Sequence, residues 1–175
     1  MSSTDQPQTD LIRRHLEYLR FYPNSVEAHY NLGLAYLQNN QMEEALAEFQ
    51  KSLQLRPTMV EALINMGGIY FRQGNLDQCI EANQKALEIS PHSFQALCNL
   101  AFSFLQKGMW EQAIVYARAA LEINPESALV HHHLAIALHK LQRNQEAMDH
   151  LQRAEELGFK PDPQVRESIE RGLSL

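Results

Sequence analysis

The sequence predicts an all-α protein built as an array of helix pairs, and three observations support this fold class. Prolines recur at an interval of 34 residues, at Pro23, Pro57, Pro91 and Pro125, and proline ends helices. Between these prolines, apolar residues recur at steps of three and four, which is the period of a helix. Leu (24) and Ala (18) far outnumber Val (5) and Thr (3), and unbranched side chains lose little rotamer freedom in a helix.

Alignment on the prolines divides most of the chain into four units of two helices each. The units are 26–59, 60–93, 94–127 and 128–161. Each first helix carries a similar segment: AHYNLGLAY, ALINMGGIY, ALCNLAFSF and, less similar, LVHHHLAIAL. Turn residues separate the two helices of each unit. They are Asn39–Gln41, Gly74–Asn75, Gly108 and Arg143–Asn144.

Both ends of the chain are expected to cover the array. Residues 1–8 are polar and are predicted to form a disordered tail, and residues 9–25 a capping half-unit that aligns with a second helix. Residues 162–175 are predicted to form an amphipathic capping helix, with Val165, Ile169 and Leu173 on one side. Such a helix would cover the apolar face that the fourth unit leaves open.

The pattern inside the units resembles the tetratricopeptide repeat family. The first helices carry Leu32, Gly33 and Tyr36, then Met66, Gly67 and Tyr70, and the third unit relaxes this to Leu100, Ala101 and Phe104. Small residues occupy the crossing positions of the second helices, namely Ala45, Ala86, Ala113, Ala120, Ala147 and Ala154. The fourth unit departs, because Phe159 replaces its proline. The resemblance implies a right-handed α-solenoid, or superhelix, of antiparallel helix pairs, with the first helices lining its concave side.

Polar residues that repeat every 34 positions on the first helices are the candidate binding residues. Asn31, Asn65 and Asn99 form such a row, and His133 continues it. An amide carries both a donor and an acceptor, so a row of Asn can pair with the backbone of an extended peptide whatever its side chains are. The row resembles the asparagine rows of peptide-gripping members of the family. The alternative is that these amides bond within the array or face water.

Residues on either side of the row are expected to give the groove a partly apolar floor. They are Tyr30, Ile64, Cys98 and His132 one residue before it, and Leu34, Gly68, Phe102 and Ile136 three residues after it. Apolar side chains with a few convergent polar groups are typical of ligand sites. Packing of helix against helix is the alternative for Leu34, Phe102 and Ile136.

The charge pattern restricts the partner. The net charge of −6 and the scattered Lys and Arg residues argue against nucleic acid. The first helices offer Glu27, Glu61 and Gln95 near their starts, with Arg72 and Lys140 only near their ends. The basic carboxylate clamp of the family's co-chaperone members is therefore not recognisable, and the predicted partner is a neutral or basic extended segment.

Catalysis, metal and cofactors are not indicated. Adjacent helical residues such as His131, His132 and His133 point about 100° apart, so these histidines are not expected to share an ion. No phosphate loop, nucleophile elbow or zinc motif occurs, and we expect no enzyme activity and no cofactor. Cys79 and Cys98 lack CxxC spacing, and no apolar run could span a membrane. A cytoplasmic protein without membrane contact is the simplest expectation.

Two functions remain open from the sequence. The first is a protein–protein interaction scaffold or adaptor that holds an extended peptide of a partner in its concave groove. The alternative is a structural assembly subunit that acts through its ends or convex face, including self-association.

Overall fold

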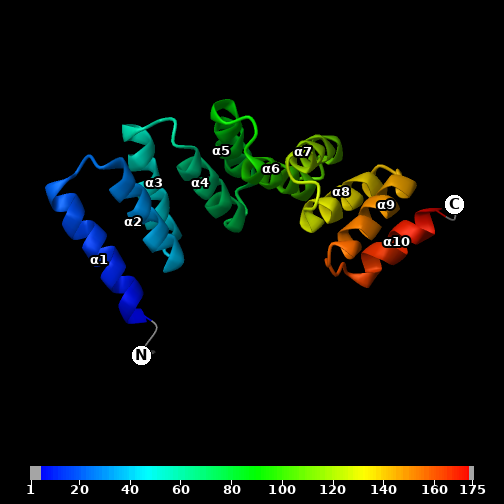
Figure 1. The fold of residues 1–175 in the computed structure, drawn as a ribbon, viewed down its shortest axis with the longest axis horizontal. Helices are drawn as coiled ribbons and strands as arrows, with labels where there is room; N and C mark the ends of the chain where they lie inside the picture. The colour runs from blue at the N-terminus through cyan, green and yellow to red at the C-terminus, as the bar shows by residue number, and fades with distance from the viewer. Residues whose placement is uncertain (1–4, 174–175) are drawn as a thin grey trace.

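The computed structural model describes residues 5–173, which form ten α-helices and no strand. The helices are α1 (Asp5–Phe21), α2 (Val26–Gln38), α3 (Met42–Leu55), α4 (Val60–Arg72), α5 (Leu76–Ile89), α6 (Phe94–Gln106), α7 (Trp110–Ile123), α8 (Ala128–Lys140), α9 (Asn144–Glu156) and α10 (Pro163–Leu173). They follow one another along an arc, with the two chain ends at opposite ends of it (Figure 1). The predicted all-α, right-handed solenoid of antiparallel helix pairs is confirmed.

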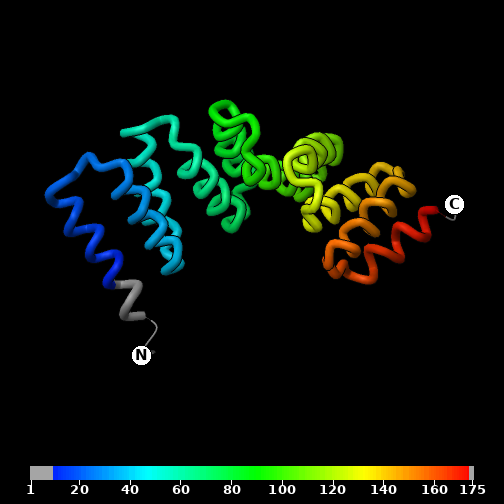
Figure 2. Tube along the Cα trace, viewed as in Figure 1, coloured from blue at the N-terminus to red at the C-terminus, as the bar shows by residue number. Residues whose placement is uncertain are grey.

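The first helices lie on the inner side of the array. Every helix packs against its neighbours in sequence, and in addition α4 contacts α6 and α6 contacts α8. No comparably extensive contact joins α5 to α7 in the described part of the chain. Since the inner helices of a curved stack approach one another more closely than the outer ones, α4, α6 and α8 form the inner surface of the arc that the trace in Figure 2 follows. The equivalent helix of the first unit, α2, continues this surface, because Tyr30 of α2 is hydrogen-bonded to Asn65 of α4.

The N-terminal helix is longer than expected. It begins at Asp5 rather than Thr9, so residues 5–8, which were predicted as disordered tail, are helical. Pro7 lies in the first turn of the helix, where a missing N–H removes no intrahelical hydrogen bond. Residues 1–4 of the predicted tail and residues 174–175 of the predicted C-terminal cap lie outside the described residues.

The turns inside the four units share one backbone conformation. Asn40, Gly74, Gly108 and Gln142 have positive φ values of 59°, 76°, 71° and 60°, and they are separated by 34 residues. In the fourth unit the turn was expected at Arg143–Asn144. The left-handed residue is instead Gln142, and Asn144 is already the first residue of α9.

Small residues let the two helices of a unit approach closely. Ala45, Ala86 and Ala113 are buried, as the crossing positions require. A Cβ added to Gly33 would lie 2.7 Å from Cε1 of Phe49, so this position cannot carry a side chain without moving the ring. The largest buried cluster runs from Leu97 to Ile169 and joins α6 to α10.

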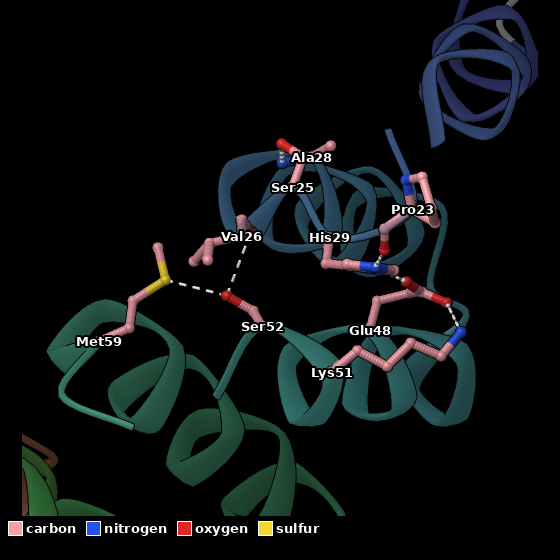
Figure 3. Close-up of polar contacts among 9 residues, drawn as sticks. All are labelled: Pro23, Ser25, Val26, Ala28, His29, Glu48, Lys51, Ser52 and Met59. Carbon is pink, nitrogen blue, oxygen red and sulfur yellow. Dashed lines mark hydrogen bonds and ion pairs between the residues drawn. The ribbon is translucent and has the colours of Figure 1, made fainter. Parts of the chain in front are cut away.

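A buried histidine ties the start of the first unit to its second helix (Figure 3). Nε2 of His29 lies 2.9 Å from the carbonyl oxygen of Pro23, and Nδ1 lies 2.6 Å from Oε2 of Glu48. Lys51 donates to the other oxygen of Glu48 at 2.7 Å. These bonds satisfy a carboxylate whose side chain is only 10% exposed, and they fix α2 against α3.

The fourth unit repeats this arrangement with a different partner. His131 lies 102 residues after His29, and its Nε2 lies 3.0 Å from the carbonyl oxygen of Pro125. Its Nδ1 lies 2.9 Å from Nδ1 of His150, the residue equivalent to Glu48. The same position of the fold is therefore satisfied by a carboxylate in one unit and by a second imidazole in another.

Candidate functional site

The predicted row lies along the inner helices, and its first member is more exposed than the other three. Asn31 on α2 is exposed, whereas Asn65 on α4, Asn99 on α6 and His133 on α8 are half-buried. Asn31 makes no side-chain hydrogen bond to the residues that the structure describes. Asn65 and Asn99 line the same cavity, and Asn31 does not.

Each half-buried amide of the row uses its nitrogen inside the array. Nδ2 of Asn65 donates to the hydroxyl of Tyr30 at 3.0 Å, and Nδ2 of Asn99 donates to Oδ1 of Asn83 at 3.0 Å. Asn83 is in turn held by its bond to the carbonyl oxygen of Cys79 at 2.8 Å. The Oδ1 atoms of Asn65 and Asn99 accept no hydrogen bond from residues 5–173. Both amides are therefore oriented by the array and keep a free acceptor.

A small cavity, named here the Gly68 pocket, lies between these two amides. Its volume is about 230 Å³. It is lined by Leu37, Ile64, Asn65, Gly68, Ile69, Arg72, Gln95 and Asn99. A Cβ added to Gly68 would meet no heavy atom within 4 Å, whereas a Cβ on the preceding Gly67 would lie 2.2 Å from Nδ2 of Asn83. The cavity thus opens at the one glycine of this helix that close packing does not require.

Stacked rings continue the inner surface toward the fourth unit. The rings of Phe71 and Phe102 have centroids 4.8 Å apart, and Phe102 stacks on His133 at 4.4 Å with an interplanar angle of 4°. These three rings come from α4, α6 and α8. They form an apolar stripe across three units of the array.

Several of the predicted floor residues also serve the core. Leu34 and Tyr30 pack against the cluster around Phe49, and Phe102, Cys98 and Ile136 against the cluster that joins α6 to α10. All five are half-buried. One side of each residue therefore packs inward, and the other remains open to solvent. Their role in a binding groove stays a prediction.

The three consecutive histidines of α8 have separate environments. His131 is bonded to His150, His132 packs against Phe159 with ring centroids 4.4 Å apart, and His133 stacks on Phe102. Burial and the neighbouring His132 lower the pKa of His133 to about 4, and burial also lowers the pKa of His132. Nδ1 of His132 is buried without a hydrogen-bond partner. In the described residues no group of three or more His, Cys, Asp or Glu could hold a metal ion.

Burial favours the neutral thiol form of both cysteines. Burial raises the pKa of Cys98 to about 11, and burial also raises the pKa of Cys79. The Sγ atom of Cys79 lies 3.1 Å from Oγ of Ser103. Since the thiolate is the reactive form, neither side chain is poised as a nucleophile.

Part of the pocket lining lies outside the residues predicted from the sequence. Leu37, Ile69, Arg72 and Gln95 line the pocket but were not among the predicted groove residues. Phe71 of the apolar stripe was not predicted either. A signal was present, because Leu37, Phe71, Leu105 and His139 form a second row with 34-residue spacing. This row lies three residues after the row that contains Gly68, which is one helical turn along the same face.

Three cavities of larger volume lie away from the amide row. The smallest of them, of about 320 Å³, lies beside Phe159 and Arg166, and Arg166 pairs with Glu155. The remaining two are larger still. One, of about 410 Å³, lies beside His131, His150 and Arg118, and the other, of about 390 Å³, is lined by residues 74–78 and Lys107. In the first, the two imidazoles already bond to each other. In the second, Lys107 pairs with Asp77.

An arc of paired helices with a continuous inner surface defines a helical-repeat protein. Tetratricopeptide repeat models match residues 26–59, 58–126 and 104–169. The chain belongs to the tetratricopeptide repeat family. Repeats of this family generally form non-catalytic interaction modules, which supports a protein-interaction scaffold.

Solved structures with the same fold share little sequence with the chain. A crystal structure of MamA is 23% identical and has a TM-score of 0.80, with 90% of this chain and 95% of that chain covered. YrrB, described as a TPR protein with an unusual peptide-binding site, is 17% identical, with a TM-score of 0.77 and coverage of 99% and 87%. PilF of Pseudomonas aeruginosa is 18% identical, with a TM-score of 0.76 and coverage of 98% and 90%.

No curated protein matches the sequence of the chain. Within residues 5–173, no helix is both long and apolar enough to cross a membrane.

Proposed function

We propose that this chain is a protein–protein interaction scaffold that holds an extended peptide segment of a partner protein along its inner surface. The observation that carries the proposal is the state of Asn65 and Asn99. Each Nδ2 is fixed by an internal hydrogen bond, and each Oδ1 is free beside a cavity. An acceptor that is already oriented loses little freedom when a peptide N–H donates to it.

The inner surface also supplies apolar contact for such a segment. Phe71, Phe102 and His133 form the stacked stripe next to the pocket. Burial of this stripe by a peptide would contribute affinity through desolvation, while the amides would fix the direction and register of the peptide backbone.

The charge of the inner surface favours a neutral segment over a basic one. Glu27, which was expected to offer negative charge, pairs with Arg56 at 2.5 Å. Glu61 remains exposed on α4, and Arg72 lies at the end of the same helix. The two charges on α4 are of opposite sign, so a strongly charged segment of either sign would gain little from long-range attraction.

The test is selection of peptides followed by variants of the row. Unstructured dodecapeptides with blocked ends are selected from a random display library on the immobilised chain, and their affinities are measured by fluorescence anisotropy. Asn31→Ala/Asn65→Ala/Asn99→Ala should weaken binding by at least tenfold, because each lost hydrogen bond contributes about 0.5–1.5 kcal/mol.

The matched control changes amides on the outer helices. Gln50→Ala/Gln84→Ala removes exposed side chains from α3 and α5, which also lie 34 residues apart. This variant should bind the selected peptides like the wild type. If the triple variant remains folded by circular dichroism and keeps the wild-type affinity, the role proposed for the row is wrong.

A second candidate, assembly through the N-terminal end, is favoured by the outer side of α1. This helix and the turn after it expose large apolar side chains, including Phe21 at 80%, Tyr22 at 57% and Tyr18 at 48%. Tyr18 and Tyr22 contact each other with centroids 4.6 Å apart. Sedimentation equilibrium over a concentration series decides between the candidates, because a strict monomer excludes self-association through this face.

A further inference from the structure

We propose that the Gly68 pocket receives one uncharged aliphatic side chain of the bound peptide, of the size of leucine or methionine. The proposal rests on the function proposed above and specifies the sequence preference of the same surface. It makes Gly68 the residue that sets which peptide side chain is accepted.

The pocket exists because one row of the inner surface lacks a side chain at a single position. Leu34, Phe102 and Ile136 occupy the equivalent positions of the other three units, and all three pack against the core clusters. At Gly68 the corresponding space is empty. A peptide side chain placed there would complete the row that the other units fill with their own residues.

The presence of glycine here has no packing explanation. Glycine inside a helix destabilises it by about 1 kcal/mol relative to alanine. Gly33 and Gly67 are required because a Cβ would collide with Phe49 and Asn83, respectively, but a Cβ at Gly68 would meet nothing within 4 Å. The helix is therefore weakened at Gly68 without a gain in internal packing, and a role in binding accounts for the residue.

The volume and lining define the occupant. About 230 Å³ is below the roughly 300–1,000 Å³ of pockets that enclose drug-sized ligands, so the space suits one side chain rather than a cofactor. Leu37, Ile64 and Ile69 contribute apolar lining. Of the charged residues only Arg72 lines the pocket, which disfavours Lys or Arg as the occupant.

A carboxylate is the competing occupant that the arginine could attract. The guanidinium of Arg72 already donates to Oδ1 of Asn40 at 2.9 Å, and its side chain is exposed. An exposed ion pair contributes little in water. Burial of an aliphatic side chain against the three aliphatic lining residues therefore contributes more to the binding free energy than an ion pair with Arg72.

The experiment uses peptides selected on the wild-type chain, as described above. One position of these peptides should be dominated by Leu, Met or Ile. Replacement of that peptide residue by Ala should weaken binding to the wild type by about tenfold or more. Gly68→Leu fills the pocket with the chain's own side chain and should weaken the original peptide by a similar factor. The peptide with Ala should then bind Gly68→Leu about as well as the original does, since the pocket contact is lost in both.

Gln84→Leu is the matched control, because it adds the same side chain to the exposed surface of α5. It should leave peptide affinity unchanged. Gly68→Leu should unfold at a temperature equal to or above that of the wild type, because leucine is the better helix former. If it fails to fold, Gly68→Ala and the substituted peptide on the wild type provide the same comparison.

The outcomes separate this inference from the proposed function. Enrichment of acidic or basic residues instead of aliphatic ones, or full affinity of Gly68→Leu for the original peptide, overturns the inference. Peptides that lose affinity for the triple Asn variant but not for Gly68→Leu would leave the proposed function standing and remove only the pocket. If the wild type enriches no peptide, both proposals fail.

Discussion

His133 shows how the inner surface controls the charge of a side chain. The ring lies flat on Phe102, and burial together with the adjacent His132 lowers its pKa from 6.5 to about 4. At neutral pH the ring is therefore uncharged, and it belongs to the apolar stripe rather than to a cationic clamp. A peptide carboxylate would gain no ion pair from it.

The lowered pKa predicts a loss of stability in acid. Between about pH 6.5 and pH 4 the unfolded chain binds a proton at His133 that the folded chain does not, so the free energy of unfolding falls as the pH falls. The contribution is complete above about pH 6.5. Because the ring is partly exposed, we expect a loss of about 2 kcal/mol rather than the full value of the pKa difference. Urea unfolding at a series of pH values measures it.

The control for this prediction is His133→Phe, which keeps a ring on Phe102 and removes the titrating group. Its free energy of unfolding should fall less steeply between pH 6.5 and pH 4 than that of the wild type. Burial also lowers the pKa values of His132 and His150, so part of the slope should remain. Equal slopes in the two proteins would contradict the assignment to His133.

Residue spacing alone located the amide row but not its hydrogen bonds. The 34-residue interval identified Asn31, Asn65 and Asn99, because a repeat places equivalent residues on one face. It could not show that Asn65 bonds to Tyr30 or that Asn99 bonds to Asn83. Such bonds depend on side-chain rotamers and on the offset between neighbouring helices, and neither is periodic.

At the scale of the helical elements, the turns show where the repeat is imperfect. Gly74 and Gly108 adopt positive φ without strain, while Asn40 and Gln142 adopt it at the same position of their units. Asparagine tolerates this conformation better than most residues, and glutamine lacks that advantage. The fourth unit therefore carries local backbone strain that the second and third units avoid.

Gln142→Gly should stabilise the protein by about 0.5–1 kcal/mol, because glycine adopts positive φ without a Cβ penalty. Thermal and urea unfolding measure the change. Asn40→Gly is the matched control at the equivalent turn and should give a smaller gain. A loss of stability in Gln142→Gly would show that its side chain compensates for the strain.

The sequence predicted the presence of the helices better than it predicted where they begin and end. Periodic apolar residues and prolines predicted two helices in each unit, because burial of one face and the loss of an N–H are strong local effects. The start of α1 at Asp5 and the turn at Gln142 were missed. The first lies in a polar stretch without periodicity, and the second lacks the glycine that marks the turns of the second and third units.

At the scale of the whole molecule, the buried contacts are unevenly distributed. The largest cluster joins α6 to α10 and includes the fully buried Ile169 of the last helix. The first helix is held by a small cluster of Ile12, Leu32 and Ala35, with Leu19 and Tyr36 packed against it. In an array where each unit contacts only its neighbours, local stability follows such local differences.

Hydrogen exchange should therefore proceed from the N-terminal end. We expect amides of α1 to α3 to exchange faster than those of α6 to α9, since less apolar surface must be exposed to open them. Exchange followed by mass spectrometry with peptide resolution measures this order. Ile12→Ala should accelerate exchange in α1 and leave α9 unchanged, and uniform protection along the chain would contradict the prediction.

The arrangement of the chain ends at opposite ends of the arc has a mechanical consequence. Each unit contacts only its neighbours, so small rotations between successive units add up along the array. The flexibility of the whole array is then determined mainly by the contact between units that allows the largest rotation. A peptide bound across α4 and α6, as proposed above, would restrict rotation at the joint between these helices and stiffen the middle of the array.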